Sequence, residues 1–155
     1  MIIEPTYTGR QYRLTTVISG LLLSVLLSTA YVVFYQRLYV ESSYLFSIIY
    51  LIPLVWLSIT MALFKHKFVW GNFPYGKAFL MCFMSGFIGS LLFSGVIYVI
   101  YAHLGMETRM GLYENGRMMR ELFSPMATAV SMLIINVLLS LVYSIIIAIF
   151  ARKKV

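Results

Sequence analysis

Charged residues and cysteine are both scarce in this chain of 155 residues, of which 11% are charged and one is a cysteine. A soluble domain of this size has about 25% charged residues. With 61% hydrophobic residues, 4 prolines and 10 glycines, the composition also excludes disordered, collagen-like and disulfide-rich secreted proteins. What remains is an integral membrane protein that is mostly helical. Cys82 lies within an apolar run, so we expect a small buried hydrophobic side chain and no redox or metal group.

Acidic side chains are the scarcest charged type, and none lies within an apolar run. They are Glu4, Glu41, Glu107, Glu114 and Glu121. The two histidines, His66 and His103, are expected at opposite membrane faces, so we expect no metal site. An ion-coupled transporter would place an ionisable group at mid-membrane. A Gly-rich phosphate loop and a nucleophile-elbow sequence are also missing, so we expect neither an enzyme nor a cofactor.

Four apolar runs are long enough to cross a hydrocarbon core, which takes about 20 helical residues. The runs cover residues 14–35, 44–64, 78–104 and 126–151. No Asp, Glu, Lys or Arg occurs within them. We therefore predict an all-α integral membrane fold, with residues 1–155 forming a single domain of four transmembrane helices.

Basic residues are concentrated on one side of the predicted membrane. An even number of spans puts the N-terminal segment, the loop after the second run and the C-terminal segment on the same side. The basic residues of these segments are Arg10, Arg13, Lys65, Lys67, Lys77, Arg152, Lys153 and Lys154. Together with Glu4 they account for the whole net charge of +7, because four glutamates match the four arginines of the opposite side. Lys and Arg mark the cytoplasmic side, so we predict that both termini are cytoplasmic and that this basic rim meets anionic lipids, with no need for nucleic acid.

The loop over residues 66–77 is rich in aromatic residues. Those expected at headgroup depth are Phe68, Trp70, Phe73 and Tyr75. Aromatic residues, Trp and Tyr above all, are enriched at this depth because their rings are amphipathic and suit the boundary between lipid and water. The loop is thus predicted to lie on the membrane surface.

The segment over residues 105–124 is the only sizeable part predicted to lie outside the membrane. Residues 117–124 have the pattern of a short amphipathic helix lying on the outer face. Ser124 is expected to cap the fourth helix, and Pro125 to begin it. The Glu and Arg residues of this segment could bind a lipid headgroup, but their spacing is that of ordinary surface ion pairs.

A weak internal repeat relates residues 10–35 to residues 76–101. It aligns Gly20 with Gly86, for example, and Tyr35 with Tyr101. Two copies of a helical hairpin would produce this pattern. Because membrane helices share their composition, chance similarity would produce it as well, and duplication stays a hypothesis.

Small residues recur at every fourth position in the first and third runs. They are Gly20, Ser24 and Ser28 in the first run and Gly86, Ser90 and Ser94 in the third. Such spacing lets helix backbones approach closely, so we expect packing within the bundle. The alternative is a groove for a lipid tail or a partner helix.

The fourth run carries a polar stripe of Asn136, Ser140 and Ser144. Asn136 is the only strongly polar side chain expected near the middle of the bilayer, where an amide must find a partner. We expect it to hydrogen-bond across helices. The alternative is that the stripe lines a permeation path.

From the third run onward the sequence resembles a known family. Phe73-Pro74-Tyr75-Gly76-Lys77-Ala78-Phe79 enters a Gly- and Ser-rich span, Phe123-Ser124-Pro125 starts the last span, and Ala151-Arg152-Lys153-Lys154 ends it. These motifs resemble the four-span Bacteroidota family known as domain of unknown function number 4199. The resemblance implies a bacterial inner-membrane protein with both ends in the cytoplasm and no established catalytic residue. It also suggests a partner, because genes of this family often lie beside a family 2 glycosyltransferase resembling polyprenyl-phosphate sugar synthases.

The function expected on these grounds is a non-catalytic accessory subunit that anchors or stabilises a membrane-associated partner. The partner or lipid-headgroup docking residues would be Lys65, Lys67, Trp70 and Lys77. A polyprenyl-phosphate glycosyltransferase of cell-envelope biosynthesis is the suggested partner. The alternative is a small oligomeric channel or transporter with the Asn136 stripe facing its pore.

Overall fold

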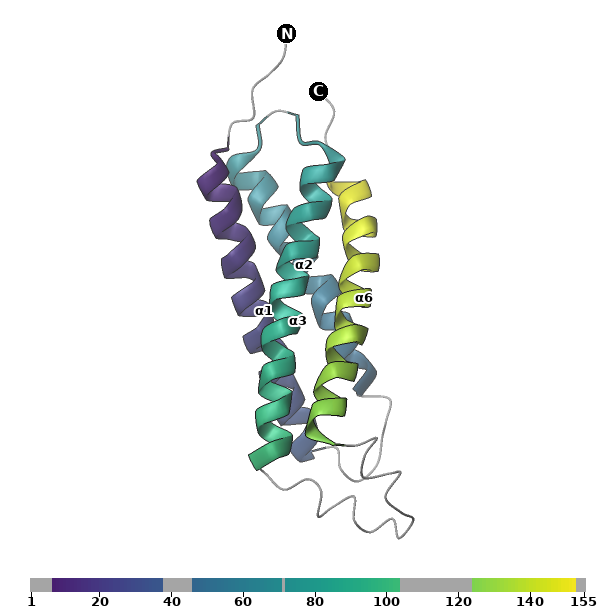
Figure 1. Cartoon of the computed structure of the whole chain (residues 1–155). Helices are drawn as coiled ribbons and strands as arrows, with labels where there is room; N and C mark the ends of the chain where they lie inside the picture. Colours follow the sequence, from purple (N-terminus) through teal and green to yellow (C-terminus); the bar gives the residue numbers. More distant parts are fainter. Residues whose placement is uncertain (1–6, 38–45, 71, 104–123, 153–155) are drawn as a thin grey trace.

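A computed structural model of the chain describes residues 7–37, 46–70, 72–103 and 124–152. These residues form four α-helices, each long and apolar enough to cross a membrane. The helices are α1 (Gly9–Arg37), α2 (Phe46–Phe68), α3 (Tyr75–His103) and α6 (Pro125–Ala151), as Figure 1 shows. The predicted all-helical class is therefore confirmed, and each of the four predicted spans falls on a helix that is long and apolar enough to cross a membrane. The predicted amphipathic helix between the third and fourth spans falls outside the described residues.

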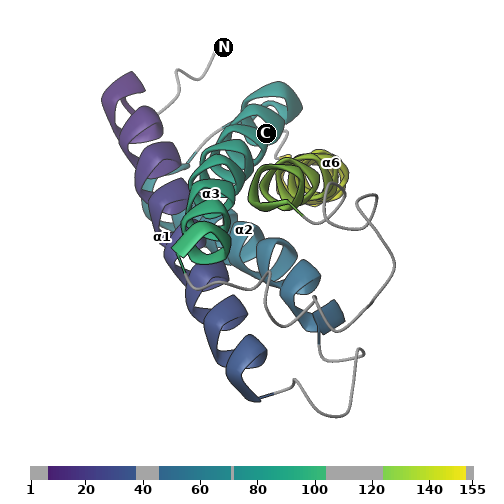
Figure 2. The same cartoon turned by 60° about the horizontal axis from the view of Figure 1, so that its bottom comes forward.

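The helices alternate in direction and lie side by side (Figure 1). The start of α1 and the end of α6 are at the same end of the bundle, which we call the terminal end. Helix α3 packs against α1 on one side and α6 on the other, and α2 contacts all three (Figure 2). As a result, α3 is the most buried of the four helices.

The helices extend beyond the apolar runs at the terminal end. Helix α1 begins at Gly9, before the run that starts at Leu14; α2 ends at Phe68, after the run that ends at Phe64; and α3 begins at Tyr75, before the run that starts at Ala78. The apolar run records only the part of a helix that suits hydrocarbon, whereas backbone hydrogen bonds and caps set where the helix ends. The aromatic loop predicted over residues 66–77 is accordingly much shorter.

Two side-chain caps fix helix starts. Thr8 and Gln11 form a reciprocal capping box before α1: the Thr8 N–H donates to Gln11 Oε1 at 2.9 Å, and the Gln11 N–H donates to Thr8 Oγ1 at 3.3 Å. At the start of α6, Ser124 Oγ accepts from the Ala127 N–H at 3.2 Å, and Pro125 occupies the first helical position. The prediction of a Ser124 cap followed by Pro125 is confirmed.

Glycines set how closely α3 approaches its neighbours. A methyl group added at Gly20 would lie 2.8 Å from Ile88 Cβ, and one added at Gly89 would lie 2.8 Å from Leu23 Cδ2. On the opposite side of α3, a methyl group at Gly86 would lie 2.5 Å from both Cβ and Oγ of Ser140. Neither the contact of α3 with α1 nor its contact with α6, which we call the two seams, has room for a larger residue at these positions, because Cβ atoms do not approach other atoms so closely.

Hydrogen bonds from hydroxyl and indole groups tie the helices together. Ser85 Oγ in α3 donates to the Thr16 carbonyl of α1 at 3.0 Å, and Ser94 Oγ donates to the Ala129 carbonyl of α6 at 2.9 Å. Further bonds between helices run from Trp56 Nε1 to the Ser19 carbonyl, between Ser19 Oγ and Thr60 Oγ1, and from Tyr143 Oη to the Tyr50 carbonyl. These bonds lie inside the bundle, while large apolar side chains cover the outside.

The Gly86–Ser140 approach generates the first prediction. Gly86→Ala should lower the free energy of unfolding by about 1–3 kcal/mol, because α3 and α6 must separate to admit the methyl group. Gly95→Ala is the matched control: nothing lies within 4 Å of its Cβ position, and alanine is the better helix former. Unfolding in mixed detergent micelles measures both variants. Equal effects at the two glycines would contradict the close-packed seam.

Candidate functional site

The terminal end contains a cluster of aromatic rings that joins the first residues of the fold to α2 and α3. We define the aromatic cluster as Tyr7, Tyr12, Phe64, Phe68 and Phe73. Tyr7 packs edge-on against Phe64 and Phe73, with ring centroids 5.4 and 5.8 Å apart. Phe64 and Phe73 are themselves 6.0 Å apart and almost fully buried. Edge-to-face packing of this kind stabilises beyond simple burial, so the cluster holds this end of the bundle together.

Basic side chains surround the aromatic cluster. Lys77 Nζ lies 5.3 Å from the centre of the Tyr7 ring, and Lys67 Nζ lies 5.4 Å from that of Phe68, both in range for cation–π attraction. The basic residues described at this end are Arg10, Arg13, Lys65, Lys67, Lys77 and Arg152. All five glutamates of the chain fall outside the described residues. Within the described part, the positive charge of the terminal end is thus not balanced by any carboxylate side chain.

The four predicted docking residues all lie at the terminal end, on α2, on α3 and on the short connection between them. Lys67 and Lys77 are exposed, Lys65 is partly buried, and Trp70 is 78% exposed. They form a basic surface with a protruding aromatic ring, which we call the docking surface.

One of the aromatic residues predicted at headgroup depth is covered by protein. Phe73 is fully buried in the aromatic cluster, so its ring does not face the membrane surface. The reason is tertiary: Tyr7 and Phe64, distant in sequence, form the pocket that Phe73 fills. Phe68 is partly buried, whereas Trp70 and Tyr75 are exposed.

The small-residue stripes face the inside of the bundle. Gly20, Ser24, Gly86, Ser90 and Ser94 are buried, and Ser28 is partly buried. Most of these serine hydroxyls donate to a carbonyl one turn earlier in their own helix, and only Ser94 reaches a neighbouring helix. The stripes therefore contribute close backbone approach more than hydrogen bonds between helices.

Asn136 does not make the hydrogen bond that the sequence led us to expect. It is 1% exposed, but its Nδ2 donates to the Met132 carbonyl of its own helix at 2.8 Å. Its Oδ1 is buried and has no hydrogen-bond partner. The prediction of a bond across helices was wrong, because the side chain folds back along α6. Ser140 and Ser144 are also buried, with Ser140 pressed against Gly86.

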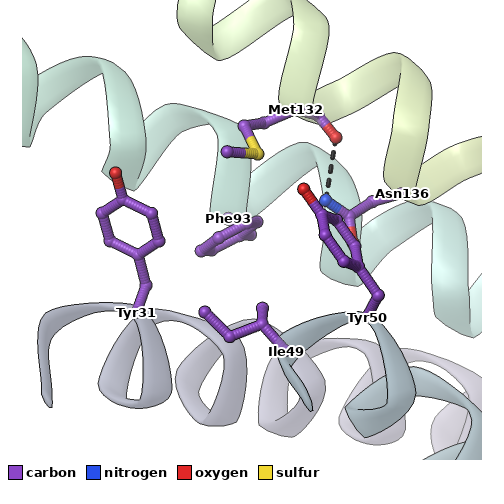
Figure 3. A pocket seen from close by; sticks show the side chains of 6 residues that line it. All are labelled: Tyr31, Ile49, Tyr50, Phe93, Met132 and Asn136. Atoms are coloured by element: carbon purple, nitrogen blue, oxygen red, sulfur yellow. Dashed lines mark hydrogen bonds between the residues drawn. The ribbon is translucent and has the colours of Figure 1, made fainter. Parts of the chain in front are cut away.

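A small cavity adjoins Asn136 in the half of the bundle away from the terminal end. Its lining comes from all four helices, namely Tyr31, Ile49, Tyr50, Phe93, Met132 and Asn136 (Figure 3). The space open to water inside it is about 10 Å³, the lower limit for a single water molecule. The sequence did not point to these aromatic residues, because nothing in it brings Tyr31, Tyr50 and Phe93 together. A cavity of this size has no room for an organic ligand.

The interior offers little chemistry. Among the described residues, no three His, Cys, Asp or Glu side chains are grouped so that they could hold a metal ion. Cys82 is 2% exposed within the hydrophobic core, which confirms its predicted role as a buried apolar side chain. Within the described ranges, the features that could engage another molecule are at the terminal end.

A scan against models of protein families, a search of curated proteins and a search of solved structures found no match to this chain. The resemblance to domain of unknown function number 4199 stays a prediction.

The burial of Phe73 gives the second prediction. Phe73→Ala should lower the free energy of unfolding by about 3–5 kcal/mol, because it leaves a hole between Tyr7 and Phe64. Trp70→Ala, on the same connection, should change it by less than about 1 kcal/mol because the side chain is mostly exposed. Thermal unfolding of the detergent-solubilised protein measures both. A larger loss for Trp70→Ala would show that the two aromatic rings have been assigned the wrong environments.

The unpartnered Oδ1 of Asn136 gives the third prediction. Asn136→Leu removes a buried carbonyl that has no hydrogen bond, so the free energy of unfolding should stay the same or rise by about 1 kcal/mol. Ser94→Ala, which removes a bond between α3 and α6, should instead lower it by about 0.6 kcal/mol. A loss above about 2 kcal/mol for Asn136→Leu, measured in the same micelles, would reveal a partner for this amide.

Proposed function

We propose that this protein is a non-catalytic membrane subunit that anchors or stabilises a membrane-associated partner through its terminal end. The observation that supports the proposal is the division of its polar groups. Inner polar groups lie in closed packing, the outer faces of the four helices are apolar, and all described lysines and arginines except Arg37 lie at the terminal end with the aromatic cluster. In the part of the chain that the structure describes, the terminal end is the distinctive surface for contact with other proteins.

The charge distribution supports a cytoplasmic location for that surface. Lys and Arg accumulate on the cytoplasmic side of multi-pass membrane proteins, and the docking surface lies on the basic side of this one. The family resemblance, taken as a proposal, adds a bacterial inner membrane. It also adds a partner class, a family 2 glycosyltransferase acting on a polyprenyl-phosphate-linked sugar. We also keep the proposal that the chain arose from two copies of a helical hairpin, but the docking surface does not depend on it.

The pore alternative receives no comparable support. A pore between copies of the chain would need the Asn136 stripe on an outer face, but Asn136, Ser140 and Ser144 are buried within the single bundle. The Ser140 side chain packs directly against Gly86, so Ser140 could face a pore only if α3 and α6 separated.

The docking surface gives the fourth prediction. Reversing its charge with Lys65→Glu, Lys67→Glu and Lys77→Glu together should reduce recovery of the partner by about tenfold or more. The proposed ion pairs of these lysines with acidic groups of the partner would become repulsive contacts. The chain is tagged, extracted from native membranes in mild detergent, and its companions are quantified by mass spectrometry. The control carries arginine at the same three positions, which keeps the charge and the cation–π contacts.

Each outcome decides a separate point. Loss of one stoichiometric companion in the glutamate variant, with retention in the arginine variant, supports both the subunit function and its surface. A companion that stays with both variants contradicts the surface. A wild-type chain that purifies only as a homo-oligomer overturns the subunit function and makes flux across proteoliposomes the next measurement.

A further inference from the structure

The cavity beside Asn136 adjoins a proline in the middle of α2. Pro53 lies inside this helix and is fully buried. Proline has no N–H, so the carbonyl of Ile49, one turn earlier, lacks the donor that a regular helix would supply. Ile49 is itself one of the residues that line the cavity (Figure 3). A hydrogen-bond acceptor of α2 is thus left without its helical donor next to the cavity.

Helix α6 supplies a second acceptor to the same cavity. Asn136 is 1% exposed, and its buried Oδ1 has no hydrogen-bond partner among the described residues. Its Nδ2 is already used by the Met132 carbonyl, so the amide cannot turn this donor toward α2 without losing that bond. A buried carbonyl oxygen costs free energy unless it is hydrogen-bonded, so Asn136 Oδ1 requires a donor.

The backbone of α2 beside Pro53 is within reach of polar groups from α6. Tyr143 Oη of α6 donates to the carbonyl of Tyr50 at 2.8 Å. A hydroxyl group of α6 thus serves the carbonyl that directly follows that of Ile49. The described helices provide no comparable side-chain donor to the Ile49 carbonyl, which therefore depends on another source.

These two acceptors determine what the cavity can hold. The occupant has to donate two hydrogen bonds, and it has to fit a space of about 10 Å³, which just admits one water molecule. Water meets both conditions, because each molecule has two O–H donors. Prolines are tolerated in membrane helices partly because ordered water can serve the backbone groups that they free. A lipid tail meets neither condition.

We propose that this cavity binds one water molecule, which donates to Asn136 Oδ1 of α6 and to the Ile49 carbonyl of α2. The link between helices that Asn136 does not make directly is then made through water. This site depends neither on a partner protein nor on the docking surface. The small stability change expected for Asn136→Leu holds with the water present, because the larger leucine side chain takes the space of the amide and the water together.

The fifth prediction tests this water site by NMR spectroscopy. The full chain is labelled with isotope-enriched asparagine and prepared in lauryl dimethylamine oxide, a detergent without hydroxyl groups. The Nδ2 protons of Asn136 are identified as the signals that Asn136→Leu removes. They should show a dipolar cross-peak to water, with the sign that marks a long-lived bound molecule. Absence of this cross-peak in the wild type would overturn the proposal.

Two proline variants test which carbonyl holds the water. Pro53→Ala restores an N–H donor to the Ile49 carbonyl, so the water loses one partner and the cross-peak should weaken about fivefold, the usual effect of one hydrogen bond on an equilibrium. Pro125→Ala is the matched control, because Pro125 occupies the first position of α6, where the helix has no carbonyl one turn earlier. It should leave the cross-peak unchanged. Equal cross-peaks in the wild type and Pro53→Ala would contradict the water site.

Two other sources of the signal are tested separately. Tyr50 lines the same cavity, and its hydroxyl proton exchanges with solvent. Loss of the cross-peak in Tyr50→Phe would assign it to this hydroxyl and overturn the proposal, whereas its retention supports bound water. Ammonium ion is also a small donor of several hydrogen bonds. A cross-peak that appears only with added ammonium chloride, at the ammonium frequency, would replace the water site by a cation site.

Discussion

The close approach of α3 to its two neighbours is the constraint on which the rest of this structure depends. Inside a membrane, apolar surfaces gain little by leaving lipid for protein, so helices associate through close packing and hydrogen bonds. Gly20 and Gly89 provide that packing toward α1, and Gly86 provides it toward α6. Only at such short separations can Ser85 and Ser94 reach backbone carbonyls of the next helix. The glycines and the hydrogen bonds therefore form one arrangement.

This arrangement determines where another molecule can be recognised. The hydroxyls of Ser19, Thr60, Ser85 and Ser94 are used in bonds between helices, and the cavity beside Asn136 is too small for an organic ligand. The outer faces present aliphatic side chains that resemble lipid tails and give little basis for specificity. Among the residues that the structure describes, specific contacts are left to the terminal end, where lysines contact the aromatic cluster.

Hydropathy predicted the four spans because the bilayer demands long apolar helices, and the cap at Ser124 followed from chemistry local to a few residues. What the sequence did not predict depends on three-dimensional structure. The burial of Phe73 depends on Tyr7, and the helix ends depend on backbone hydrogen bonds outside the apolar runs. The Asn136 amide was expected to bond across helices, but its rotamer placed it on its own helix.

Contacts between α1 and α3 hold the docking surface in place. The Tyr12 hydroxyl of α1 donates to the Lys77 carbonyl at 2.6 Å, while the Lys77 ammonium group contacts the Tyr7 ring. The first turn of α3, which carries part of the docking surface, is therefore attached to the start of the chain by a hydrogen bond and a cation–π contact. Because α1 and α3 are also closely packed at Gly20, the two helices resist relative movement. A surface built on rigidly joined helices suits the proposed role of an anchor, because its side chains keep one arrangement with and without the partner.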